Sequence, residues 1–170
     1  MTENFQNNTV HYFPDIVEVE FEAIDKSYLK VIIINFLLVF LPLLAGLIVL
    51  HLWVFPENVN EFIILIYSTF IVLFGFILAY LAVSFTKRKY VLREKDISYK
   101  CGLFVKTLTT VPFSRIQHVE TDEKPISRIF GLSSLSVFTA GDSSDDLVIK
   151  GITKKKALQI KEFITSEINE

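Results

Sequence analysis

Histidine and cysteine are the side chains of this chain most suited to metal or nucleophilic chemistry, and they stand far apart. His11, His51 and His118 fall in three different segments, so we do not expect them to share a metal ion. His118 could act as a ligand or a base, but no acidic or cysteine partner stands at motif spacing, which favours a structural role. Cys101 follows Lys100 and could be a reactive thiol, although a lone cysteine on a strand is more often simply packed. The sequence therefore predicts no catalytic residue, no cofactor and no metal site.

Acidic residues gather after Gly141. The run contains Asp142, Asp145 and Asp146, separated by serines. These carboxylates could bind calcium, yet the run lacks the mid-loop glycine and the terminal glutamate of a helix-loop-helix calcium site. Aspartate, serine and glycine also suit the tip of a β-hairpin, which is the interpretation we favour.

Basic residues form two clusters that could contact an anionic membrane surface. They are Lys87, Arg88 and Lys89 in the first, and Lys154, Lys155 and Lys156 in the second. Each cationic side chain is worth about 1 kcal/mol near an anionic leaflet. The first cluster has an equally good explanation in membrane topology. Lysines in the first turn of a helix oppose its dipole by about 0.3 to 1 kcal/mol each, so the second cluster is neutralised by the aspartates, exposed to water, or used for binding.

Two uncharged apolar runs precede most of these residues. Residues 31–55 and 62–85 contain no Asp, Glu, Lys or Arg, and only the short loop 56–61 separates them. At about 1.5 Å per residue each run exceeds the roughly 30 Å hydrocarbon core of a bilayer. The sequence therefore predicts two transmembrane helices joined as a hairpin.

Lysine and arginine in the flanking segments predict the orientation of this hairpin. The flanking positive charges are Lys26, Lys30, Lys87, Arg88, Lys89 and Arg93. The connecting loop has none, so both termini are expected in the cytoplasm. Residues 1–30 are then a cytoplasmic segment. We expect the first span to be retained, because some thirty residues precede it and its apolar run is longer than that of a signal peptide.

Small and polar residues inside the spans offer sites for helix contact. Gly75 and Ala79 lie four residues apart and form a small-xxx-small surface for close helix–helix packing. Pro42 and Gly46 could bend the first helix. No charge lies within either span, which argues against a transport pathway.

Residues 86–170 change to short β-rich segments and end in a helix. Expected strands cover 89–93, 97–104, 105–113, 115–121, 135–140 and 147–152, with a helical turn over 125–130 and a further strand over 14–24 before the spans. Thr153 can cap a final helix to about Ile168. Gly131 and Gly141 are the expected positive-φ positions. This pattern predicts a mainly β, α+β domain in the form of a small antiparallel barrel or roll closed by one C-terminal helix, and we expect 86–170 to fold autonomously.

Several spaced elements resemble one family. They are Val111-Pro112-Phe113-Ser114-Arg115-Ile116-Gln117-His118-Val119-Glu120, then Ile126-Ser127-Arg128-Ile129-Phe130-Gly131-Leu132, then Val137-Phe138-Thr139-Ala140-Gly141, then Leu147-Val148-Ile149-Lys150-Gly151-Ile152. Together they are similar to the YdbS-like bacterial membrane proteins, which carry a pleckstrin-homology-like (PH-like) domain. The resemblance implies a split barrel of two sheets with a C-terminal helix, in the inner membrane, and no established reaction. Eukaryotic PH domains bind inositol phosphates at a basic loop, and the corresponding loop, which we place at Glu94-Lys95-Asp96, is not basic.

Two functions follow as hypotheses. The favoured one is a non-enzymatic membrane-anchored interaction module that presents its PH-like domain to a protein partner, by resemblance a homologous PH-like membrane protein. Its candidate contacts are Phe113, Arg115, Gln117 and His118. The alternative is an accessory subunit of an envelope export or lipid-handling complex that acts through its spans, at Gly75, Ala79 or Asn35. Nucleic-acid binding gets little support because acidic residues are interspersed with the basic ones, and no small-molecule substrate is apparent.

Overall fold

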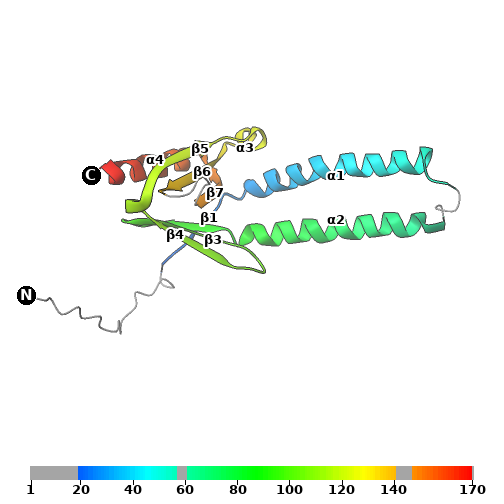
Figure 1. Ribbon diagram of the computed structural model, residues 1–170, viewed down its shortest axis with the longest axis horizontal. Helices are drawn as coiled ribbons and strands as arrows, with labels where there is room; N and C mark the ends of the chain where they lie inside the picture. Colours follow the sequence, from blue (N-terminus) through cyan, green and yellow to red (C-terminus); the bar gives the residue numbers. More distant parts are fainter. Residues whose placement is uncertain (1–18, 57–60, 141–146, 170) are drawn as a thin grey trace, which may run out of the picture.

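A long helical hairpin and a small β-domain make up the molecule (Figure 1). The computed structural model describes residues 19–56, 61–140 and 147–169. In chain order the elements are β1 (Glu22–Ala23), α1 (Tyr28–Trp53), α2 (Ile63–Thr86), β2 (Lys89–Leu92), β3 (Asp96–Cys101), β4 (Thr107–Pro112), the 3₁₀ turn η3 (Phe113–Arg115), β5 (Ile116–Asp122), α3 (Pro125–Ile129), β6 (Leu132–Thr139), β7 (Leu147–Thr153) and α4 (Lys154–Asn169).

The two helices of the hairpin lie side by side and are joined by aromatic packing. α1 has 26 residues and α2 has 24, and both are apolar enough to cross a membrane. The Phe40 ring lies 4.4 Å from the rings of both Phe70 and Phe74, and Phe36 lies 5.2 Å from Phe74. α1 runs through Pro42 as one continuous helix. The predicted transmembrane hairpin is therefore present, with α1 beginning three residues earlier than expected.

Two antiparallel sheets form the β-domain. One sheet has the order β1-β2-β3-β4 and the other the order β5-β6-β7. Alternate strand residues point inward, and Ile97, Leu135 and Ile149 are completely buried between the sheets. α4 packs Ala157, Ile160 and Ile164 onto this core, as its helical spacing predicts. The predicted PH-like split barrel closed by a C-terminal helix is confirmed.

The β-domain is assembled from both sides of the hairpin. β1 precedes α1 and pairs with β2, which follows α2, with Glu22 opposite Tyr90. Ile24 also belongs to the buried core. The domain therefore extends beyond 86–170, because its first strand lies before the membrane helices. The connection between the first two strands is consequently the membrane hairpin itself, and Glu94-Lys95-Asp96 leads from β2 into β3 instead.

Glycine conformations separate the correct turn predictions from the missed ones. Gly131 has a φ of 66°, so its predicted turn after α3 is confirmed. The prediction for Gly141, like those for the aspartates that follow it, lies outside the described residues. Gly102 and Gly151 also have positive φ, at 96° and 83°, and the sequence analysis did not anticipate them. Of the strand predicted over 14–24, the described part forms only Glu22–Ala23.

Candidate membrane-proximal site

The start of α1 is packed tightly onto the β-domain. The backbone N–H of Asp25 donates to the carbonyl oxygen of Gly151, at 2.8 Å. A side chain at Gly151 would collide with the ring of Tyr28, so glycine is needed for this approach as well as for its positive φ. Val31 is buried one turn further along the helix. We call this contact, made by Ile24, Asp25, Tyr28, Val31 and Gly151, the α1 junction; Tyr28 and Val31 also border a cavity of about 480 Å³.

Arg88 belongs to this packed side rather than to a basic surface. Its guanidinium lies 6.0 Å from the centre of the Tyr28 ring, in cation–π contact. Burial raises the pKa of the nearby Tyr99 to about 12, although the charge of Arg88 opposes that rise. Lys87, the C-cap residue of α2, and Lys89, the first residue of β2, are exposed, and both line a cavity that Arg88 does not border. The structure therefore divides the predicted cluster 87–89 between two faces.

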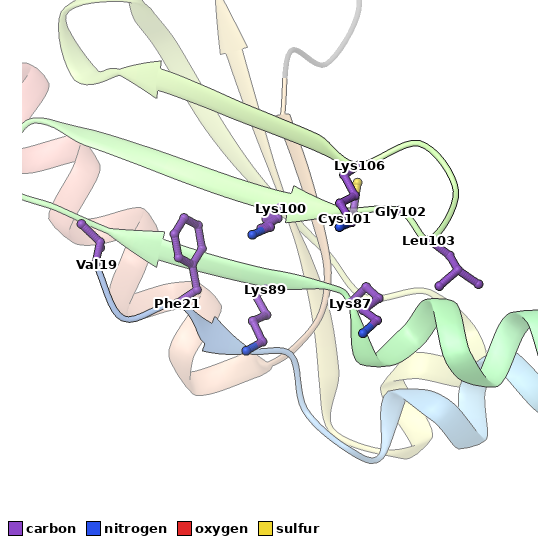
Figure 2. Close-up of a pocket in the computed structure, with 9 residues that line it drawn as sticks. All are labelled: Val19, Phe21, Lys87, Lys89, Lys100, Cys101, Gly102, Leu103 and Lys106. Atoms are coloured by element: carbon purple, nitrogen blue, oxygen red, sulfur yellow. The ribbon is translucent and has the colours of Figure 1, made fainter. Parts of the chain in front are cut away.

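The end of α2 borders an open cavity of about 580 Å³ that is rich in lysine. Lys87, Lys89, Lys100 and Lys106 line it, together with Val19, Phe21, Cys101, Gly102 and Leu103 (Figure 2). We call these residues the lysine pocket. Lys89 and Lys100 are directly opposite each other on β2 and β3. The Lys100 Nζ lies 5.9 Å from the centre of the Phe21 ring. Among the described residues, no carboxylate forms an ion pair with any of the four lysines.

The β3–β4 hairpin carries this pocket alongside the membrane helix. Its tip exposes Phe104 and Val105, which are 79% and 78% accessible. The Phe104 ring stacks on Tyr80 of α2, with centroids 5.8 Å apart and planes 10° apart. Gly102 makes the tip possible, because a Cβ at this position would collide with the carbonyl oxygen of Val105. The tip therefore lies beside the C-terminal part of α2 (Figure 1).

A second candidate surface lies on β5, and the structure changes its membership. Phe113 is only 5% exposed and meets Phe163 edge-on at 6.0 Å, so it belongs to the core and not to the surface. Arg115, Gln117 and His118 are exposed, as a binding surface requires. The His118 ring stacks on Phe138 with centroids 4.3 Å apart. We call Arg115, Gln117, His118 and Phe138 the β5 surface.

Comparison with known proteins assigns the family. A family model described as Bacterial PH domain matches residues 29–168. The chain belongs to the bacterial PH domain family. The UPF0699 transmembrane protein YdbS of Bacillus subtilis (strain 168) is 35% identical over 52 residues, which is 31% of this chain and 33% of YdbS. The aligned stretch thus covers about a third of that relative's length. No solved structure gives a significant match.

The second lysine cluster of this bacterial PH domain protein lies at the start of α4 and is largely neutralised. Lys154 forms an ion pair with Glu123 at 2.6 Å, and Lys156 forms one with Glu22 at 3.0 Å. The predicted partners, the aspartates after Gly141, lie outside the described residues. The N–H of Lys156 donates to the Thr153 hydroxyl at 3.3 Å, which confirms the predicted cap. Lys155 is exposed.

The transmembrane candidates do not form the contact between the two helices of this bacterial PH domain protein. Gly75 and Ala79 are exposed, and a Cβ built at Gly75 would meet nothing within 4 Å. Phenylalanines form the helix interface instead. The Asn35 side chain donates to the carbonyl oxygen of Val31 at 2.8 Å, within its own helix. His51 Nδ1 lies 3.2 Å from the Tyr67 hydroxyl, near the far end of the hairpin. Gly75 and Ala79 are therefore left open on the outer face of α2.

Sequence reasoning missed two of the four lysines of the lysine pocket. Lys100 and Lys106 stand alone in the sequence, and only the pairing of β2 with β3 brings Lys100 opposite Lys89. A usable signal was present, because Tyr99 and Lys100 alternate inward and outward on a predicted strand. No group of three or more potential metal ligands occurs among the described residues.

Proposed function

We propose that this bacterial PH domain protein is a non-enzymatic interaction module, which holds its PH-like domain at the inner leaflet and presents it to a protein partner. The observation that carries the proposal is the pairing of β1 with β2. Both ends of the membrane hairpin continue into one sheet, so the domain has two short tethers instead of one flexible linker. A fixed orientation favours presentation of a surface, because it lowers the ordering cost of binding. The family it belongs to is generally non-catalytic.

The β5 surface is the face we propose for the partner. It combines the exposed cation of Arg115 and the amide of Gln117 with the stacked rings of His118 and Phe138. Aromatic residues and arginine are enriched where protein partners bind, since they supply contact area and directional hydrogen bonds. Glu120 lies 3.6 Å from His118 Nε2 and borders this surface.

Site-specific photo-crosslinking of the full chain in its native membrane tests this proposal. A photoreactive residue at Gln117 should give a discrete adduct, and Arg115→Glu in the same chain should abolish it. A probe at the exposed Glu94, on the β2–β3 turn, serves as the matched control and should give none. Adducts of equal yield from Gln117 and Glu94, or an adduct that persists with Arg115→Glu, would reject the β5 surface as the binding site.

A second candidate function rests on the open face of α2. Gly75 and Ala79 are free to receive a partner helix, since nothing in the described hairpin covers Gly75. This favours an accessory subunit that acts through its transmembrane helices in an export or lipid-handling complex. A photoreactive residue at Val72, on the same exposed side, should then give the adduct while Gln117 gives none.

The proposed orientation, with both termini in the cytoplasm, is tested by thiol labelling. In a Cys101→Ser background, a cysteine at Asn58 should react with a membrane-impermeant reagent in intact cells, whereas one at Ser144 should react only after lysis. The reverse pattern would place the β-domain outside the cytoplasm and refute the proposal.

A further inference from the structure

The lysine pocket concentrates positive charge, and no carboxylate among residues 19–56, 61–140 and 147–169 forms an ion pair with its four lysines. Lys89 and Lys100 are cross-strand neighbours, and like charges in that arrangement destabilise a sheet. Lys87 and Lys106 add two further ammonium groups around the same cavity. By contrast, Lys154 and Lys156 on α4 each have a glutamate partner. Repulsion among these lysines destabilises this part of the sheet, and a bound anion would offset that destabilisation.

The position of the pocket indicates where such an anion comes from. Tyr80 lies six residues before the end of α2, and Phe104 stacks on it. At 1.5 Å per residue, the hairpin tip therefore lies beside α2 about 9 Å before the C-terminal end of the helix, on the side of the membrane span. Exposed Phe and Val at this level suit the boundary between headgroups and acyl chains. Figure 2 shows Lys87 and Leu103 at the end of the pocket next to α2, and Val19 and Phe21 at the opposite end.

We propose that the lysine pocket binds the phosphate headgroup of an anionic membrane phospholipid, whose acyl chains run along α2 beside Tyr80 and Phe104. Ammonium groups donate charge-assisted hydrogen bonds to phosphate oxygens. A zwitterionic phospholipid would bring its own cation among four lysines, so the pocket selects headgroups without an amine. This site is separate from the β5 surface, so the lipid proposal and the protein-partner proposal can be tested independently.

Cys101 provides a built-in reporter, because it is the only cysteine of the chain and it lines the pocket. The full chain is purified in a mild non-ionic detergent, and the rate of its reaction with N-ethylmaleimide is measured at fixed pH. Short-chain phosphatidylglycerol should slow the reaction at least about fivefold when it is in several-fold excess over its dissociation constant. Phosphatidylcholine of the same chain length should have no effect. Inorganic phosphate at equal concentration distinguishes a free anion from a lipid and should protect far less.

Two double variants of equal charge change give the specificity control. Lys89→Gln with Lys100→Gln removes the facing pair of the pocket, and protection by phosphatidylglycerol should be lost. Lys95→Gln with Lys155→Gln removes two exposed lysines that do not line the pocket, and protection should be unchanged. Thermal unfolding provides a second readout: phosphatidylglycerol should raise the Tm of the wild type and not that of the pocket variant.

Three results would overturn the assignment. Equal protection by phosphatidylcholine would show that detergent-like contact and not the headgroup matters. Protection of the pocket variant would show that the lysines are not the ligands. Protection by inorganic phosphate as strong as that by the lipid would assign the pocket to a soluble anion.

Discussion

The two ends of the membrane hairpin meet the β-domain in opposite ways. At the α1 junction, Gly151 and Tyr28 are packed so closely that no side chain fits between them. At the end of α2, the lysine pocket leaves a cavity of about 580 Å³ lined by four lysines. The first contact is closely packed at Gly151, although a cavity of about 480 Å³ adjoins it beside Tyr28 and Val31. The second contact is open and lined by lysines.

This difference indicates a division of labour between the junctions. Close packing lowers the free energy of one arrangement, so the α1 junction holds the domain in a fixed orientation to the helices. An open, like-charged pocket contributes nothing to stability by itself and is retained at some cost. We therefore expect substitutions at the α1 junction to change folding, and substitutions at the lysine pocket to change binding.

The largest expected effect is that of Gly151→Val. Its positive φ and the collision with Tyr28 should together lower the free energy of unfolding of the β-domain by on the order of 3 kcal/mol or more. Thermal unfolding of the full chain in nanodiscs measures this loss. Gly46→Ala, in open space on α1, is the control and should change the Tm little. Equal Tm values for the two variants would contradict the close packing at Gly151.

Ile24→Ala should have the next largest effect. Ile24 is buried in the core although it precedes the membrane helices, and truncating a buried isoleucine costs about 2 to 5 kcal/mol. Ile129→Ala removes the same atoms from a residue that is 78% exposed, and should cost less than about 0.5 kcal/mol. Chemical denaturation of the full chain distinguishes them. An isolated 86–170 fragment as stable as the full chain would also argue against a structural role for β1 and Ile24.

The hairpin tip gives a smaller effect that tests the open junction. Phe104→Ala removes a stack on Tyr80 that is worth about 0.5 to 1.5 kcal/mol. Its depth can be measured directly: Phe104→Trp in a Trp53→Phe background should be quenched by brominated lipids in nanodiscs. Leu158→Trp, on α4, is the control and should not be quenched. Equal quenching at both positions would contradict the placement of the tip in the bilayer interface.

The smallest expected effect concerns the neutralised lysines of α4. Lys154→Gln and Lys156→Gln should each lower the free energy of unfolding by about 0.2 to 1 kcal/mol, because each removes one partly exposed ion pair. Lys155→Gln should be neutral or slightly stabilising, since it removes a positive charge from the first turn of a helix. Denaturation at low and high salt measures both, and the losses should shrink at high salt. A larger loss of unfolding free energy for Lys155→Gln than for Lys156→Gln would contradict the ion pair between Lys156 and Glu22.

Local pattern was sufficient to predict the membrane hairpin and most of the barrel. Uncharged runs of more than twenty residues have one stable solution in a bilayer, and period-two alternation followed by a stripe on α4 predicts strands and a closing helix. The turn at Gly131 and the cap at Thr153 were also accessible, because both depend on residues next to them in sequence. The family resemblance rested on the same local segments.

Contacts between distant segments had to be decided by the tertiary structure. The pairing of β1 with β2 joins residues separated by the whole hairpin, and no local pattern encodes which strands become neighbours. Strand register decided that Lys89 faces Lys100, and packing against Phe163 decided that Phe113 is core and not surface. Position 151 must be glycine because the side chain of Tyr28, which is distant in sequence, occupies the space that a Cβ would need. The residue types and elements are thus properties of the sequence, whereas the lysine pocket and the α1 junction exist only because folding brings separate segments into contact.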